Sequence, residues 1–234
     1  MPFERSPIAP SDAAPPPRAI AGQISWNYDR TEILADAIVH ATGIVLGLVG
    51  AVAIIGFAAQ TKEVEVVPVA IYVAGLMTML IVSAAYNLWP VSPTKWILRR
   101  FDHSAIYLLI VGTYTPLLAQ MKSGLASVSL GVGLWVSAAV GVFLKLALPG
   151  RFDRAAIILC LLLGWSGVVI YEAIVAALPS ISLWLLATGG ILYTIGTLFH
   201  VYESLRFQNA IWHFFVMLAA ICHYLAVFAS LSWR

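Results

Sequence analysis

The stretch RRFDHSAIYLLIVGTYTP, residues 99–116, places Asp102 and His103 at the start of an apolar run that contains no further charged residue. Runs of this kind recur along the chain, which is 61% hydrophobic, only 10% charged and has a mean hydropathy of +0.92. Soluble globular domains carry about 25% charged residues. The composition therefore indicates an integral membrane protein.

Seven segments are long and apolar enough to cross a hydrocarbon layer about 30 Å thick, which takes about 20 residues of helix. Because the segments are continuously apolar, they are typical of spanning helices and not of the alternating strands of a membrane barrel. The predicted fold class is all-α, a seven-transmembrane helix bundle. Its predicted spans are residues 33–59, 66–89, 103–121, 124–147, 154–177, 181–200 and 209–231.

The chain divides into a tail and one membrane domain. Six of the twelve prolines lie in the first 17 residues, a composition that cannot build a packed core. The tail lacks the basic start, apolar stretch and cleavage site of a signal peptide. Residues 1–30 are predicted as a disordered and then interfacial tail, and residues 31–234 as the seven-helix transmembrane domain.

The basic residues predict how the bundle is oriented. All but three of the thirteen Lys and Arg fall in the N-terminal tail or in alternate connections on one side, the exceptions being Lys62, Lys122 and Arg234. Basic residues concentrate in cytoplasmic segments, so the N-terminus is predicted to be cytoplasmic and the C-terminus outside. The net charge of +2 follows from this topology and does not indicate a nucleic-acid partner. We expect a multi-pass protein of the bacterial inner (plasma) membrane.

Polar residues within the spans recur every four positions, a spacing that puts them on one helix face. The pattern holds for Ser83 with Asn87, for Asn209 with His213, and for Glu32, Asp36 and His40. With the predicted topology these groups, and Asp102 with them, lie near the cytoplasmic surface. Buried polar residues in spans usually face the bundle interior, so the sequence predicts a polar inner-leaflet pocket, with His103 and His200 as further candidates.

Simpler interpretations of these residues remain open at this stage. Asp102 pairs with Arg99 or Arg100 in one of them, and Asp36 pairs only with His40 in another. His200 is typical of an interfacial anchor. A third interpretation is a proton or ion relay through Asp36, His40 and Asp102.

Five segments of the chain together carry a family resemblance: SAAYN, RRFDHSAIYLLIVGTYTP, LKLALPGRFDRAAIILCLLLGWSGV, GGILYTIGTLFH and QNAIWHFFVMLAAICHYLAVF. They closely resemble the haemolysin III family, which belongs with the progestin and adipoQ receptors. The resemblance covers about residues 30–230. It implies seven helices and a cytoplasmic N-terminus. In relatives that resemble the adiponectin receptors, zinc is held by a second-helix histidine that closes a Ser-x-x-x-His motif and by two seventh-helix histidines four residues apart. The third-helix aspartate holds a zinc-bound water.

Only part of this pattern carries over. Ser83 matches the serine, Asp102 the aspartate and His213 the second histidine of the seventh helix, whereas the other two ligand positions are Asn87 and Asn209. A carboxamide oxygen is a neutral, weak donor that suits zinc poorly. The resemblance thus implies a zinc site whose ligand set is incomplete in this sequence.

Two functions follow from these observations. The favoured one is a haemolysin III-like membrane protein whose polar pocket binds a membrane lipid or serves membrane homeostasis. The alternative is a metal-dependent hydrolase of lipid amide or ester bonds, in which zinc activates a water positioned by Asp102, with Ser83 as a second catalytic candidate. The sequence leaves the choice between binding and catalysis open, and it does not indicate an oligomeric state.

Overall fold

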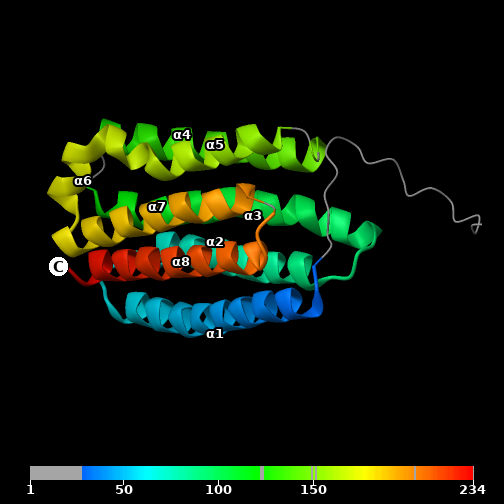
Figure 1. Ribbon diagram of the computed structural model, residues 1–234. Helices are drawn as coiled ribbons and strands as arrows, with labels where there is room; N and C mark the ends of the chain where they lie inside the picture. The colour runs from blue at the N-terminus through cyan, green and yellow to red at the C-terminus, as the bar shows by residue number, and fades with distance from the viewer. Residues whose placement is uncertain (1–27, 122–123, 149, 151, 203, 234) are drawn as a thin grey trace, which may run out of the picture.

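The computed structural model describes residues 28–234 with the exception of 122–123, 149, 151, 203 and 234, and its regular structure is helical (Figure 1). The predicted all-α class is confirmed. The helices are α1 (Arg30–Gln60), α2 (Val66–Leu88), α3 (Pro93–Gln120), α4 (Leu125–Ala147), α5 (Asp153–Trp165), the 3₁₀ segment η1 (Ser166–Ile170), α6 (Tyr171–Ala177), α7 (Ser180–Val201) and α8 (Gln208–Ser232).

Successive long helices run antiparallel through one bundle. Figure 1 shows α1 and α8 beginning at the same end of the bundle, while α8 finishes at the opposite end, where the C-terminus is marked. We call the end where α1 and α8 begin the polar end. Ion pairs of Asp153 with Arg99 and Lys145 place the start of α5 and the end of α4 there too.

Six helical segments within the described residues are long and apolar enough to cross a membrane: α1, α2, α4, the joined segment Ala155–Ala177, α7 and α8. The predicted count was seven. The segment outside this set is α3, which begins at Pro93, ten residues before its predicted span, and so includes a polar first half. That half carries Lys95, Arg99, Arg100, Asp102 and His103.

Local capping signals fix where two of these helices begin. The Asp29 side chain accepts hydrogen bonds from the backbone N–H groups of Thr31 and Glu32, and the Glu32 carboxylate accepts from the Asp29 N–H in return. Ser92 caps α3 by accepting from the N–H of Lys95. The predicted tail lies outside the described residues as far as residue 27, and helix begins at Arg30.

The predicted span 154–177 is confirmed as helical but is interrupted. The α-helical hydrogen bonding of α5 gives way to η1 at Ser166 and resumes in α6. Tyr114 of α3 contacts this interruption, since its hydroxyl donates to the Gly164 carbonyl at 2.8 Å and accepts from the Gly167 N–H at 2.9 Å. Backbone groups released by the change of helix type are thereby satisfied within the bundle.

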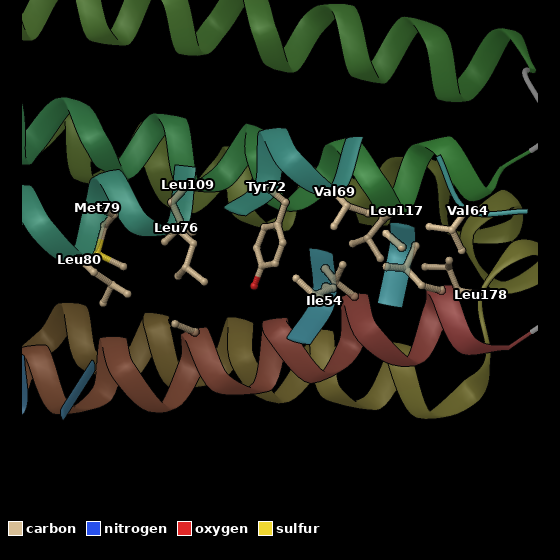
Figure 2. Packing of buried hydrophobic residues seen from close by; sticks show 14 of the residues in the cluster. Ile54, Val64, Val69, Tyr72, Leu76, Met79, Leu80, Leu109, Leu117 and Leu178 are labelled. Atoms are coloured by element: carbon tan, nitrogen blue, oxygen red, sulfur yellow. The ribbon is translucent and has the colours of Figure 1, made fainter. Parts of the chain in front are cut away.

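The main apolar core lies between α1, α2, α3 and α8. Figure 2 shows its labelled members, among them Ile54 of α1, Tyr72 and Leu76 of α2 and Leu109 of α3. Helices α2 and α3 approach so closely that a Cβ atom at Gly75 would lie 2.7 Å from the carbonyl oxygen of Leu108. Small residues allow such close packing between membrane helices. This core holds α1, α2 and α8 in register at the polar end.

Candidate functional site

Asp36 is the centre of a buried polar cluster at the polar end. One of its carboxylate oxygens, Oδ1, accepts a hydrogen bond from Nδ1 of His213 at 2.6 Å, and Oδ2 accepts from the side-chain amide of Asn209 at 3.0 Å. Nε2 of His40 lies 3.6 Å from the same Oδ2. Asp36 and His40 therefore do pair, as one interpretation of the sequence held, but Asp36 also joins α1 to two residues of α8.

The cluster continues into α2 through two carboxamides. The Asn209 amide donates to Oδ1 of Asn87 at 2.9 Å, and the Asn87 amide donates to the carbonyl oxygen of Ser83 at 2.9 Å. The same Asn87 nitrogen lies 3.3 Å from the Ser83 hydroxyl and 3.5 Å from Nε2 of His213. We call these six residues the Asp36 cluster: Asp36, His40, Ser83, Asn87, Asn209 and His213.

The sequence pattern explains why each helix contributes two members. Residues four positions apart lie on one helix face, and the three pairs of the cluster all have this spacing. The end of α2 is fixed beside them by Lys95, whose ammonium group donates to the backbone carbonyls of Asn87 and Trp89 at 3.0 and 2.8 Å. Carbonyls at a helix C-terminus lack intrahelical donors, so this buried lysine completes the end of α2.

Asp102 lies next to this cluster but belongs to a different surface. It is partly exposed and lines a cavity, and its electrostatic neighbours include His213, Ser83 and His40. Among the described residues no ion pair joins Asp102 to Arg99 or Arg100, although Arg99 is among its electrostatic neighbours. The Arg99 guanidinium instead donates to Asp153 at 2.7 Å.

A second charged group joins α3, α4 and α5 at the polar end. Asp153 accepts from Arg99 and, through its other oxygen, from the ammonium group of Lys145 at 2.6 Å. Partial burial alone would raise the pKa of the Asp153 carboxyl, but the hydrogen bonds from these two cations outweigh it and lower that pKa to about 2. His103 and His200 line the same part of the cavity, and the His200 ring lies 5.1 Å from that of Trp212.

The cavity has a volume of about 1550 Å³ and is bounded by α3, α5, η1, α6, α7 and α8. Its polar end is lined by charged and polar side chains, and the rest of its length is largely apolar. Asp36, His40 and Ser83 are not among its lining residues, whereas Asn87, Asn209 and His213 are. The polar lining includes Asn87, Lys95, Arg99, Asp102, His103, Lys145, Asp153, His200, Asn209 and His213, and the apolar lining includes Ile110, Leu117, Leu161, Trp165, Ile174, Leu183 and Leu186.

Two sets of residues can be compared as metal ligands. At the ligand positions that the resemblance implies, Asn87 and Asn209 are engaged in hydrogen bonds with each other, and carboxamides suit zinc poorly, so this set does not fit. Asp36, His40 and His213 offer one carboxylate oxygen and two imidazole nitrogens that lie within 4.8 Å of one another, a donor set that zinc accepts. Nε2 of His40 is buried without a hydrogen-bond partner, which also fits a ligand role. The four-residue spacing predicted that Asp36 and His40 lie on one helix face, but it did not predict that His213 of α8 lies beside them.

Comparisons with known proteins agree with the resemblance. A family model described as Haemolysin-III related matches residues 30–224. A Hemolysin-3 homolog of Bacillus subtilis (strain 168) is 34% identical over 187 residues, which cover 80% of this chain and 88% of that protein. Hemolysin-3 of Bacillus cereus is 32% identical over the same length, with 80% and 85% covered. The human Monocyte to macrophage differentiation factor is 28% identical over 167 residues, 69% of each chain.

Proposed function

The chain belongs to the haemolysin-III-related family and is an integral multi-pass membrane protein, and from this premise we propose that it binds a membrane lipid in the cavity between α3, α5, α7 and α8. The observation that carries the proposal is the distribution of side chains along the cavity. One end is charged and the remaining length is largely apolar. This is the polarity of a single amphiphile whose head lies at the polar end.

The size of the cavity supports a lipid over a small solute. Pockets for small molecules are typically about 300–1,000 Å³, and this cavity has about 1550 Å³. Charges of both signs surround the proposed head group. Arg99 and Lys145 supply cationic donors, and Asp102 supplies a carboxylate that forms no ion pair with Lys or Arg among the described residues.

We further propose that α3 is a seventh span and that the polar end of the bundle faces the cytoplasm of a bacterial cell, in the inner membrane. Its 28 residues give α3 a length of about 42 Å, enough to cross a bilayer although its first half is polar. The basic residues of alternate connections support the orientation. A reporter fused after Arg234 should be periplasmic and one placed at residue 91 cytoplasmic. Two reporters in one compartment would overturn the seven-span topology.

Lipid binding is tested by filling the cavity. Ala187 of α7 lines the cavity and Ala139 of α4 is exposed on the outside of the bundle. We expect Ala187→Trp to lower the amount of lipid that remains bound to the purified protein at least several-fold, as measured by mass spectrometry of extracted lipid. Ala139→Trp, the matched control, should retain it. Equal lipid content in both variants, with both folded, would contradict binding in the cavity.

A second candidate function, the metal-dependent hydrolase, is favoured by the Asp36, His40 and His213 donor set. The position of these three residues relative to the cavity argues against catalysis on a bound lipid. Of this donor set only His213 lines the cavity, whereas Asp36 and His40 do not. A reaction on the bound lipid needs a metal on the cavity side, beside Asp102, where Asn87 and Asn209 stand. Zinc bound by this chain is therefore proposed to tie α1 to α8 and to serve the fold.

A further inference from the structure

We infer that the lipid in the cavity carries a hydroxyl group on its chain, bound between Tyr193 and His223 about 15 Å from its head. The inference rests on the proposed lipid-binding function and specifies its ligand. It concerns a part of the cavity wall that the Asp36 cluster does not reach, formed by α7 and α8 near the middle of the bundle.

His223 of α8 provides one half of this second polar group. Its Nε2 lies 3.3 Å from the backbone carbonyl oxygen of Leu186 in α7. A carbonyl oxygen can only accept, so Nε2 must carry the proton of this hydrogen bond. In the neutral ring Nδ1 then keeps its lone pair. His223, which lines the cavity, can therefore accept a hydrogen bond from a ligand.

Tyr193 provides the other half. Its ring lies edge-on to the ring of His223, with centroids 5.4 Å apart and planes at 64°, and it lines the cavity as well. Its hydroxyl oxygen is buried and, among the described residues, has no hydrogen-bond partner. A buried hydroxyl without a partner is unfavourable, and phenylalanine would avoid the cost. The hydroxyl is thus available to donate to a bound group.

Tyr72 of the neighbouring apolar core is a second buried tyrosine in this part of the bundle. It is 1% exposed, and its hydroxyl likewise has no hydrogen-bond partner within the described part of the chain. Figure 2 shows its ring standing between the helices of the apolar core with the hydroxyl pointing away from α2. Tyr193 is among its electrostatic neighbours. Of these two tyrosines with unpaired hydroxyls, Tyr193 lines the cavity and Tyr72 does not.

The chemistry and depth of these groups specify the ligand. An imidazole nitrogen that accepts and a phenol that donates are both satisfied by a hydroxyl, which can donate and accept at once. His223 follows His213 by ten residues of α8, which is about 15 Å along the helix. A lipid with its head beside His213 and its chain along the cavity would carry the hydroxyl at that distance.

The test compares two fatty acids that differ by one hydroxyl. We expect the full-length protein in detergent to bind 12-hydroxystearate about 5- to 10-fold more tightly than stearate, in a competition assay or by calorimetry, the factor expected for about one hydrogen bond. Tyr193→Phe should abolish the preference. His223→Phe should also abolish it.

Tyr224→Phe is the matched control. The Tyr224 hydroxyl already donates to the backbone carbonyl of Gly50 at 3.0 Å, and Tyr224 does not line the cavity, so this variant should keep the preference. Equal binding of the two acids to the unmodified protein would overturn the hydroxyl site and leave the proposed function standing. A preference that survives in both Tyr193→Phe and His223→Phe would overturn it too. Failure of both acids to bind at all would count against lipid binding itself.

Discussion

The two sides of the bundle differ sharply in how they are packed. Of the apolar 18-residue stretch of α2, 39% is buried inside the protein. The corresponding share is 6% in the segment Ala155–Ala177, which belongs to α5, η1 and α6. The first side holds the Asp36 cluster in a close-packed frame. The second side, which we call the α5–α6 wall, covers the cavity and contacts the rest of the bundle through few groups. The difference shows how one membrane bundle combines a rigid polar cluster with space for a ligand.

Leu159, Cys160 and Leu163 of the α5–α6 wall pack against α3 and α4, and the Trp165 indole donates to the Thr194 hydroxyl of α7 at 3.2 Å. The other polar contacts of the wall occur at two places. At the polar end Asp153 binds Arg99 and Lys145, and near the middle Tyr114 binds the backbone around η1. Apolar residues of the wall such as Leu162 and Val169 are 65% and 83% exposed in the protein alone and would face lipid. Changes on the packed side should therefore affect stability more than changes in the wall.

The largest effect is expected from restoring histidines at the two carboxamide positions. The double variant Asn87→His with Asn209→His gives three imidazoles, His213 included, at the boundary between the packed side and the cavity. Three such ligands and a water satisfy zinc. Zinc content, measured by elemental analysis, should reach about one ion per chain, and saturating zinc should stabilise the folded protein by about 4 kcal/mol through linkage.

Each single variant is the control for this experiment, because two histidines bind zinc much more weakly. The unmodified protein also needs measurement. Stoichiometric zinc that resists mild chelation in the unmodified protein, and that is lost in His40→Ala, would show that Asp36, His40 and His213 already bind an ion. No gain of zinc in the double variant would mean that the three positions do not converge on one point.

A smaller but substantial effect is expected when the packed side loses its central carboxylate. Asp36→Ala leaves the His213 and Asn209 donors buried without their acceptor, and we expect the free energy of unfolding to fall by about 3 kcal/mol. Thermal unfolding in detergent measures it. Glu172→Ala is the matched control, since it removes an exposed carboxylate from the α5–α6 wall and should cost less than about 0.5 kcal/mol. Similar losses in both variants would remove the contrast between the two sides.

The sequence predicted the helices well because hydrocarbon imposes a strict length and polarity on each span. The predicted spans 66–89 and 209–231 agree with α2 and α8 within one residue at each end. It failed where polar residues enter a helix or where the helix type changes. The first half of α3 was missed because its charges hid a helix that a serine cap begins at Pro93, and η1 leaves no gap in the apolar run.

The candidate site was predictable within each helix and not between helices. Four-residue spacing gave the pairs of the Asp36 cluster, since that spacing is a property of one helix. The bond between Asp36 and His213 joins residues 177 positions apart and depends on how α1 packs against α8. For the same reason the sequence did not show that Arg99 binds Asp153. Charge attraction to Arg99 favours the carboxylates of Asp102 and Asp153 alike, and only the packing of α3 against α5 decides which one Arg99 binds.

The smallest expected effect concerns the polar contact of the α5–α6 wall with α3 and α4. The pKa of Asp153 is lowered from its ordinary value of 3.8 to about 2 in the folded protein. The contribution of this group to stability is therefore fully present above about pH 4 and is lost as the pH falls toward about 2. Since the Asp153 side chain is 33% exposed, solvent screening should reduce this contribution to about 1 kcal/mol or less.

Unfolding measured at about pH 5 and again at about pH 2 tests this contact. Asp153→Asn has no carboxylate to titrate, so its stability should fall less than that of the unmodified protein over the same pH interval. Because Asp153 joins the wall to the bundle, hydrogen exchange at the start of α5 should quicken in acid, while exchange in α2 stays slow. An equal fall in stability for both proteins would place the acid-sensitive group elsewhere. It would also mean that Arg99 and Lys145 do not hold the wall in place.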